Sequence, residues 1–504
     1  MKNIKYIILS IGLLFGLFAC EQEVVVYEPK PFEDPADPVL PAATAGTADF
    51  SKFVAVGNSL TSGYQAGALF TEGQNNSLPF IMNEKFKDVG AGSFNQPDIN
   101  SVNGFSGTDG TNVFGRLLLK GTTPTPQPGD IPTAFTGDKA ALNNFGVPGI
   151  LLGQALIAGT GTPGHPFENG LYTRFASAPG TSTIIGDAAT ANGTFFMFYL
   201  GNNDVLGYAS RGADGSIPLT SVSDFTFQYQ AALNVLTTNP TTKGVVVNIG
   251  DIASIPFFTL VPWNAVPLDE ATADVLNAGF AGVNGFLDTV VGAGLLASAD
   301  AEARKISYSE GANPVLITDE SLSSLLPILD NFLAGGLITA TQYAGLVPFV
   351  QARPATSDDL MTLRAAAVIG TELAPNVVHG VSYPLADTYT LTAAEVLEIT
   401  TRITDFNQAI AGAASAIGVG DRVAHADMNA AFKSVAFGGY QDNTFFTTNT
   451  FAPPFGAFSE DGVHPNSRGY AWAAGQIIEA INAKFGSTIH KPDLRLYKGT
   501  ALPY

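Results

Sequence analysis

The stretch Phe53–Gly63, with the sequence FVAVGNSLTSG, decides the fold that we expect. Its apolar run ends at Gly57, and Ser59 follows two residues later. A short apolar run that stops at a glycine is typical of a buried parallel strand, which delivers a loop at its carboxyl end. We therefore expect a buried parallel strand over 53–56, ending at Gly57, and a tight strand-to-helix turn that exposes the Ser59 hydroxyl above the sheet.

Similar apolar runs recur along the chain, at Thr194–Leu200 (TFFMFYL), Gly244–Ile249 (GVVVNI) and Val423–Met428 (VAHADM). Apolar residues recur at helical spacing in the stretches Phe225–Leu236, Glu270–Leu287, Leu391–Ile417 and Ser467–Phe485. Strands that alternate with helices predict an α/β fold with a doubly wound parallel sheet and helices on both faces. Ligands of such folds bind beyond the carboxyl ends of the strands, so we expect the chemistry in the loops there.

The first twenty residues have the pattern of a secretory signal. Lys2 and Lys5 precede an apolar run over 7–17, which is too short to span a bilayer as a stable anchor. The run ends in LFAC at 17–20, which resembles the bacterial lipobox, in which the cysteine becomes the acylated N-terminus. We expect a signal peptide at 1–19, lipidation of Cys20, and a protein anchored through this lipid at the bacterial outer membrane or cell surface.

The remaining organisation follows from composition. Residues 20–48 are rich in proline, acidic and small residues, which favours a flexible tether after the lipidated cysteine. A folded domain is expected over 49–490, followed by a C-terminal extension at 491–504. The stretches 65–143 and 255–389 fit an α/β core poorly, and we interpret them as long insertions around the active face.

Charge and cysteine content exclude several classes of function. The net charge of −20 repels phosphate backbones, so no nucleic-acid partner is expected. Cys20 is the only cysteine, so after lipidation no thiol remains for a disulfide, a metal or a nucleophile. No spacing of histidines with carboxylates indicates a metal site, and no glycine-rich loop carries a phosphate-binding lysine. We therefore predict no metal and no cofactor.

Four separated segments carry residues that suit acyl transfer. The Ser59 turn offers a hydroxyl and a backbone N–H near the same point. Asn144–Gly149 is a glycine loop whose bare backbone can approach a ligand, and an asparagine of Gly201–Asp204 can donate to an oxyanion. Finally, Asp461 and His464 lie three residues apart, so one loop can place the carboxylate on one ring nitrogen while the other faces the serine.

In content and order these four segments resemble the blocks of the SGNH (GDSL-like) hydrolase family, from Phe53 to about Trp472. The resemblance implies an SGNH-like (flavodoxin-like) parallel sheet and an active site with a nucleophilic serine, an Asp–His pair and an oxyanion hole. Position by position, it implies a nucleophile at Ser59, a catalytic pair at Asp461 and His464, and an oxyanion hole formed by Ser59, Gly149 and Asn203.

Two positions depart from the family pattern or leave a choice open. Asn58 stands where the common family form has an aspartate before the serine. We interpret this position as a support of the turn, so activity should survive the exchange. Gly146 competes with Gly149 as the glycine donor, and the distance from Asn144 in the family pattern favours Gly149.

The function expected from the resemblance is hydrolysis of a carboxylic ester through an acyl-enzyme, of the carboxylesterase or lipase kind. The apolar stretch 255–389 is a candidate roof for an acyl-chain groove, which favours an acylated small molecule or lipid as substrate. The Asn- and Gly-rich loops equally suit an acetylated glycan, so a carbohydrate O-acetylesterase is the alternative. A catalytically silent surface lipoprotein that only binds its partner is the alternative of another class.

Overall fold

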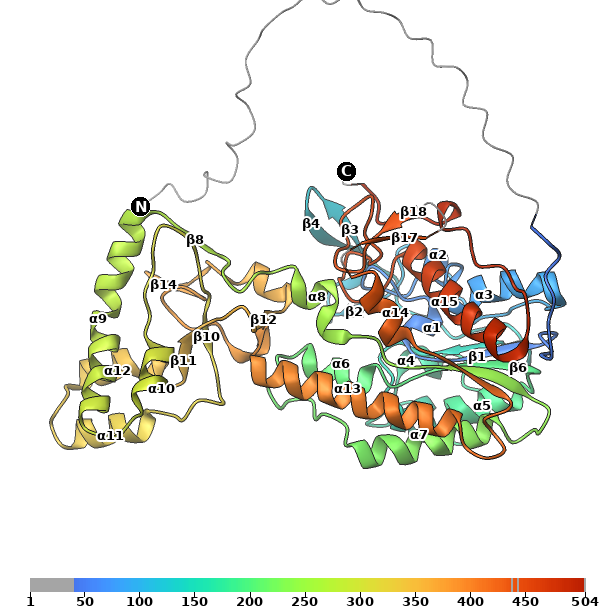
Figure 1. Cartoon of the computed structure of the whole chain (residues 1–504), viewed down its shortest axis with the longest axis horizontal. Coiled ribbons are helices and arrows are strands. Elements are labelled where there is room, and N and C mark those ends of the chain that lie inside the picture. Colours follow the sequence, from blue (N-terminus) through green and yellow to red (C-terminus); the bar gives the residue numbers. More distant parts are fainter. Residues whose placement is uncertain (1–39, 437, 442–443, 503–504) are drawn as a thin grey trace, which may run out of the picture. The chain divides into compact units, whose positions relative to one another are not determined.

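The computed structural model describes residues 40–436, 438–441 and 444–502 (Figure 1). The expected signal peptide at 1–19, Cys20 and most of the tether lie outside the described residues. From Ala43 onward the chain forms one compact unit, whose first residues are fixed by a hydrogen bond of 2.9 Å from the Thr47 N–H to the Phe485 carbonyl. Within the described residues, no helix combines the length and the apolar character needed to cross a bilayer.

A five-stranded parallel sheet forms the centre of this unit, in the order β16-β7-β6-β1-β5. Its strands are β1 (Phe53–Gly57), β5 (Asn144–Gly146), β6 (Phe195–Tyr199), β7 (Lys243–Val247) and β16 (Val423–Ala426). From β1 the chain winds first outward to β5 and then back across to β6. The sheet therefore has a topological switch point between β1 and β6, where ligands of doubly wound folds bind.

The four strands predicted from apolar runs are confirmed, and every side chain of β1 and β6 is buried, as expected for a sheet covered on both faces. The fifth strand, β5, was not predicted, because its residues belong to a stretch interpreted as a glycine loop. It has only three residues and pairs with β1, with Ala55 opposite Asn144 and Gly57 opposite Gly146. The confirmed fold is thus α/β, with a parallel sheet flanked by helices.

Helices cover both faces of the sheet (Figure 1). On one face lie α3 (Leu78–Phe86) and α15 (Ser467–Phe485), and on the other α5 (Ile184–Thr190), α7 (Val222–Leu236) and α13 (Ala393–Ala414). Aromatic side chains fill both interfaces: Phe195 packs on Phe86 and Phe485, whereas Phe225 of α7 stacks on Phe406 of α13 with ring centroids 3.8 Å apart. The helices expected over 225–236, 391–417 and 467–485 are confirmed within a few residues.

Shorter elements surround this core. The short α-helices are α1 (Ser59–Ser62), α2 (Thr71–Gln74), α4 (Gly170–Thr173), α6 (Asn203–Ala209), α8 (Pro256–Thr259) and α14 (Met428–Ser434). The 3-10 helices are Lys87–Val89, Lys139–Ala141, Gly153–Leu156, Ala158–Gly161, Ile252–Ser254, Val347–Phe349, Leu363–Ala367, Asp387–Tyr389 and Leu494–Leu496. A further hairpin pairs β17 (Gly439–Gln441) with β18 (Thr444–Phe446).

The stretch 65–143 divides into a core part and a peripheral part. Helix α3 packs in the main core against α15, with Met82 and Phe86 fully buried. Beyond it, β2 (Gly107–Thr108), β3 (Val113–Lys120) and β4 (Thr123–Pro128) form a small antiparallel sheet. The C-terminal stretch likewise joins the core, since Leu494 is fully buried beside α15.

The stretch 255–389 has hydrophobic clusters of its own, separate from the main core. Its helices are α9 (Glu270–Gly292), which confirms the expected helix over 270–287, α10 (Ser298–Arg304), α11 (Leu326–Ala334) and α12 (Ala340–Leu346). Its short strands form antiparallel pairs. Two of the pairs are β8 (Val266–Leu268) with β9 (Gly311–Asn313) and β10 (Leu316–Thr318) with β11 (Ala352–Pro354). The others are β13 (Glu372–Ala374) with β14 (Val377–Val378), and β12 (Leu360–Met361) with β15 (Thr390–Leu391), which lies just beyond the stretch.

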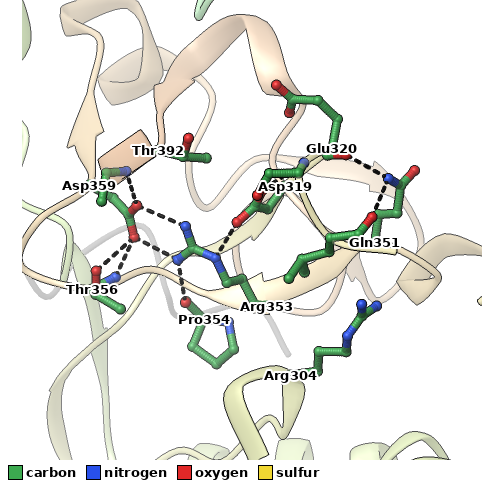
Figure 2. A network of polar contacts seen from close by, with 12 residues as sticks. Arg304, Asp319, Glu320, Gln351, Arg353, Pro354, Thr356, Asp359 and Thr392 are labelled. Atoms are coloured by element: carbon green, nitrogen blue, oxygen red, sulfur yellow. Dashed lines mark hydrogen bonds and ion pairs between the residues drawn. The ribbon is translucent and has the colours of Figure 1, made fainter. Parts of the chain in front are cut away.

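A buried ion-pair network joins this stretch to the start of α13 (Figure 2). The Arg353 guanidinium donates to Asp319 at 2.6 Å and to both oxygens of Asp359 at 2.6 and 2.8 Å. Asp359 in turn accepts from the Ala393 N–H, in the first turn of α13, at 3.0 Å. Burial alone would raise the pKa of Asp359, but the hydrogen bonds from Arg353 hold it below its ordinary value.

Candidate functional site

Ser59 lies directly beyond the carboxyl end of β1, as the first residue of α1. Asn58 caps this helix, because its side-chain oxygen accepts from the Leu60 N–H at 3.0 Å. Gly57 allows the tight turn, since a Cβ there would lie 2.7 Å from the Tyr199 carbonyl oxygen. The Ser59 side chain is thus held on a short, capped turn next to the switch point of the sheet.

Asp461 and His464 form a hydrogen-bonded pair in the loop before α15. The His464 Nδ1 lies 2.8 Å from Asp461 Oδ2, and both side chains are largely buried, at 13 % and 12 % exposed. Asp461 Oδ1 also accepts from the Val463 and His464 N–H groups, each at 2.8 Å. Burial alone would raise the pKa of Asp461, but attraction to His464 and these hydrogen bonds hold it below its ordinary value.

A loop just after α1 supports this pair, and the sequence analysis did not identify it. The Gly67 N–H donates to Asp461 Oδ2 at 2.7 Å, and the Tyr64 ring lies on the His464 ring with centroids 4.8 Å apart. The Tyr64 hydroxyl donates to the Gly67 carbonyl at 2.5 Å. The Ser459 hydroxyl lies 3.2 Å from Asp461 Oδ1 and accepts from the Ala66 N–H at 2.7 Å. The loop over 64–67 therefore binds Asp461 Oδ2, whereas the main chain of Val463 and His464 binds Asp461 Oδ1.

Both stretches interpreted as insertions reach this part of the site. The Leu117 N–H, from β3, donates to the Ala66 carbonyl at 2.7 Å, so the small antiparallel sheet braces the 64–67 loop. The Phe257 N–H, from α8, donates to the Gly462 carbonyl at 2.9 Å. Gly462 adopts a φ of +70°, which favours glycine. The loop that carries Asp461 and His464 is thus supported on two sides.

Asn203 is the first residue of α6, directly after β6. Its amide nitrogen donates to the Ile150 carbonyl at 2.9 Å, which uses one of its two N–H bonds. The preceding Asn202 is engaged differently, because its side-chain oxygen accepts from the Asn58 amide at 3.3 Å. The Asn58 side chain therefore supports the turn through both of its polar atoms, which agrees with the role expected for this position.

The two candidate glycines differ in what their N–H groups contact. The Gly146 N–H donates to the Asn144 side chain at 2.9 Å, and a Cβ at Gly146 would lie 2.4 Å from the Ser62 nitrogen. Gly149 is exposed, has a φ of +74° and has open space where a Cβ would lie. Among the described residues, no acceptor binds the N–H of Gly149 or of Ser59. Gly146 therefore has a packing role, and Gly149 is the better candidate for a donor.

Asp204 fastens the start of α6 to the loop that contains Gly149. Its carboxylate is buried and accepts from the Leu152 N–H at 3.0 Å and from the Thr220 hydroxyl at 3.1 Å. Burial raises the pKa of Asp204 to about 6. Asp204 thus supplies a structural contact at this position.

Ser59, Asn203 and His464 all line one cavity. Gly149 is not among its lining residues. Most of the wall is apolar, and the remaining lining residues are Asn58, Leu60, Leu78, Tyr199, Asn202, Leu206, Gly250, Asp251, Ile252, Ile255, Met428, Phe432, Phe458, Val463, Pro465, Tyr470 and Ala473. The three predicted segments that carry Ser59, Asn203 and His464 therefore meet at one place.

One group of carboxylates in the described part of the chain is close enough to hold a metal ion. Oxygens of Glu320, Asp387 and Glu395 lie within 4.8 Å of one another. Burial and the neighbouring Glu320 raise the pKa of Asp387 and of Glu395 well above the ordinary range. None of the three lines the cavity at Ser59.

Comparisons with protein-family models, with curated proteins and with solved structures found no match to this chain.

Proposed function

We propose that the chain is a serine ester hydrolase of the SGNH type, with Ser59 as nucleophile and His464 and Asp461 as its catalytic partners. The observation that carries this proposal is the shared cavity of Ser59, Asn203 and His464, three residues from distant parts of the chain. A second support is the geometry of the Asp461–His464 pair, because a carboxylate on Nδ1 leaves Nε2 as the proton acceptor. A module that only binds a partner has no need of this combination.

In the proposed reaction, the Ser59 hydroxyl attacks the carbonyl carbon of the ester while His464 Nε2 accepts the hydroxyl proton. The N–H of Ser59 and the second amide N–H of Asn203 stabilise the oxyanion of the tetrahedral intermediate, and the N–H of Gly149, which does not line the cavity, is the third candidate donor. The carbon–oxygen bond to the alcohol then breaks, and His464 returns the proton to the leaving alcohol. Water that gives its proton to His464 attacks the acyl-serine, which releases the acid and restores Ser59.

Hydrolysis of p-nitrophenyl butyrate by the full chain tests this proposal, together with labelling by a fluorophosphonate. Ser59→Ala should abolish both labelling and detectable turnover. Ser62→Ala is the matched control, because Ser62 is a buried serine of the same turn that does not line the cavity, and it should still be labelled. If wild-type protein neither hydrolyses the ester nor reacts with the probe, the binding lipoprotein takes the place of the hydrolase.

We also propose that Cys20 carries a lipid that anchors the protein at the bacterial outer membrane or cell surface. The support is the lipobox-like LFAC at 17–20 after a short apolar run. Two acyl chains on one terminus suffice for stable anchoring without a membrane-spanning helix. Cys20→Ala should release the protein from the membrane fraction, and tight retention of this variant would contradict the anchor.

A further inference from the structure

The wall of the cavity is built from apolar side chains of the domain core. Leu78 of α3, Met428 at the start of α14 and Phe458 are all buried, and each belongs to the main hydrophobic core. Ile252 and Ile255 add further apolar surface from the loop after β7. A group that enters this cavity is therefore surrounded mainly by aliphatic and aromatic carbon.

The polar side chains of the cavity have few free bonding positions for a ligand. Asn58 and Asn202 bind each other, and Asn58 also caps α1. Asn203 uses one N–H on the Ile150 carbonyl, and we assign its other N–H to the oxyanion. Among the described residues, Asp251 is the one aspartate or glutamate that lines the cavity. Outside the residues assigned to catalysis, the several hydroxyls of a sugar ring would find mainly the Asp251 carboxylate as a partner, and the hydroxyls left buried without partners would disfavour binding.

We propose that this cavity binds the acyl chain of the substrate, so that the enzyme prefers acyl groups of several carbons over acetyl. The inference rests on the proposed function, because it requires Ser59 to attack the carbonyl carbon at the head of this chain. Each CH₂ group that leaves water for an apolar wall should raise kcat/KM by about fourfold, the equivalent of about 0.8 kcal/mol. Acylated small molecules and lipids then rank above acetylated glycans as substrates.

The test is a series of p-nitrophenyl esters from acetate to decanoate, hydrolysed by the full chain, with acetylated xylan as a competing substrate. In the wild type, kcat/KM should rise by about fifteenfold from acetate to butyrate, and again by a similar factor to hexanoate. A rate on acetate or on acetylated xylan above that on butyrate would overturn the acyl-chain site.

Two variants, one that fills the cavity and one that enlarges it, make the test specific. Ala473→Leu adds volume to the wall contributed by α15 and should lower the hexanoate-to-acetate ratio of kcat/KM by at least about tenfold. The matched control is Ala483→Leu, an exposed position on the same helix that does not line the cavity, which should keep the wild-type ratio. Phe432→Ala enlarges the cavity at a half-buried position and should move the preferred ester to a longer chain.

Labelling of Ser59 by a fluorophosphonate separates failure of this inference from failure of the proposed function. If the protein is labelled but prefers acetate, or if both cavity variants keep the wild-type chain-length preference, the hydrolase proposal stands and the acyl-chain site is wrong. Protein that is neither labelled nor active on any ester loses both. A rise with chain length that Ala473→Leu blunts and Phe432→Ala extends supports the site.

Discussion

Replacing Asp461 with asparagine should lower kcat/KM by about a thousand- to ten-thousandfold, because the new amide has one tolerable orientation and that orientation disables His464. In the structure, Asp461 Oδ1 accepts two main-chain N–H groups, from Val463 and His464, at 2.8 Å each. Asp461 Oδ2 accepts one main-chain N–H, from Gly67 at 2.7 Å, and pairs with His464 Nδ1. Oδ1 therefore has one more main-chain donor than Oδ2, and an NH₂ group could accept from none of them.

An NH₂ group at the Oδ1 position would face two main-chain donors, whereas at the Oδ2 position it faces one. Each unsatisfied buried donor costs about 1–3 kcal/mol, so the amide nitrogen should take the Oδ2 position, with stability lowered by about that amount. There it donates to His464 Nδ1, which must become an acceptor. The ring proton then sits on Nε2, which can no longer take the proton of Ser59.

Steady-state kinetics on p-nitrophenyl butyrate give the rate loss, and ¹⁵N NMR of His464 reports which ring nitrogen carries the proton. Ser459→Ala is the control, because it removes a hydroxyl that contacts Asp461 Oδ1, the Ala66 N–H and the His464 carbonyl, and so weakens the support of the pair without reversing the polarity at Nδ1. We expect it to lose only about tenfold in kcat/KM. An Asp461→Asn variant within tenfold of wild type, with Nδ1 still protonated, would refute the reasoning.

Three further changes test other parts of the structure. Asn203→Ala should lower kcat on p-nitrophenyl butyrate by about a hundred- to a thousandfold with little change in KM, and an unchanged kcat would remove it from the oxyanion hole. Arg353→Met leaves two buried carboxylates unpaired and should lower the free energy of unfolding by about 3–5 kcal/mol, measured by urea denaturation against Arg353→Lys, which should lose less. The folded-state pKa of Asp387 and of Glu395 is raised to about 8, so the folded chain binds more protons at these groups than the unfolded chain does. The free energy of unfolding should therefore fall as pH rises from about 4 to about 8. Asp387→Asn relieves the repulsion from Glu320, so its melting temperature should fall less over this range; a parallel fall in both proteins would contradict the assignment.

Four of the five strands of the sheet were predictable because each is an apolar run that ends at a break. The fifth, β5, has only three residues and begins with Asn144, whose side chain is used for contacts to Thr61 and Gly146. Its strand geometry comes from pairing with β1, which no local pattern records. Helix α3 was hidden for a related reason, because its core-facing residues are embedded in a stretch of low periodicity.

In the candidate site, too, contacts between neighbouring residues were predictable, whereas contacts between distant segments were not. The turn at Ser59 and the pairing of Asp461 with His464 are local, so residue type and spacing made them candidates. Their expected roles came from the order of the four segments and the family resemblance. The support from Tyr64 and Gly67 joins segments 394 residues apart in the case of Gly67 and Asp461. It consists of a ring contact and a main-chain N–H, and neither has a sequence signature.

The origin of the cavity wall changes the role of the stretch 255–389. The sequence favoured it as a roof over an acyl groove because it is apolar, yet within the described residues Ile255 is its only lining residue. Its apolar side chains instead fill its own clusters, as those of Phe280 and Leu329 do. Composition cannot distinguish residues that line a cavity from residues that pack against each other. Because most of the wall comes from elements that also build the core, the acyl preference proposed here is coupled to the packing of the sheet. The stretch 255–389 acts on the site through Ile255 and through the contact of Phe257 with Gly462.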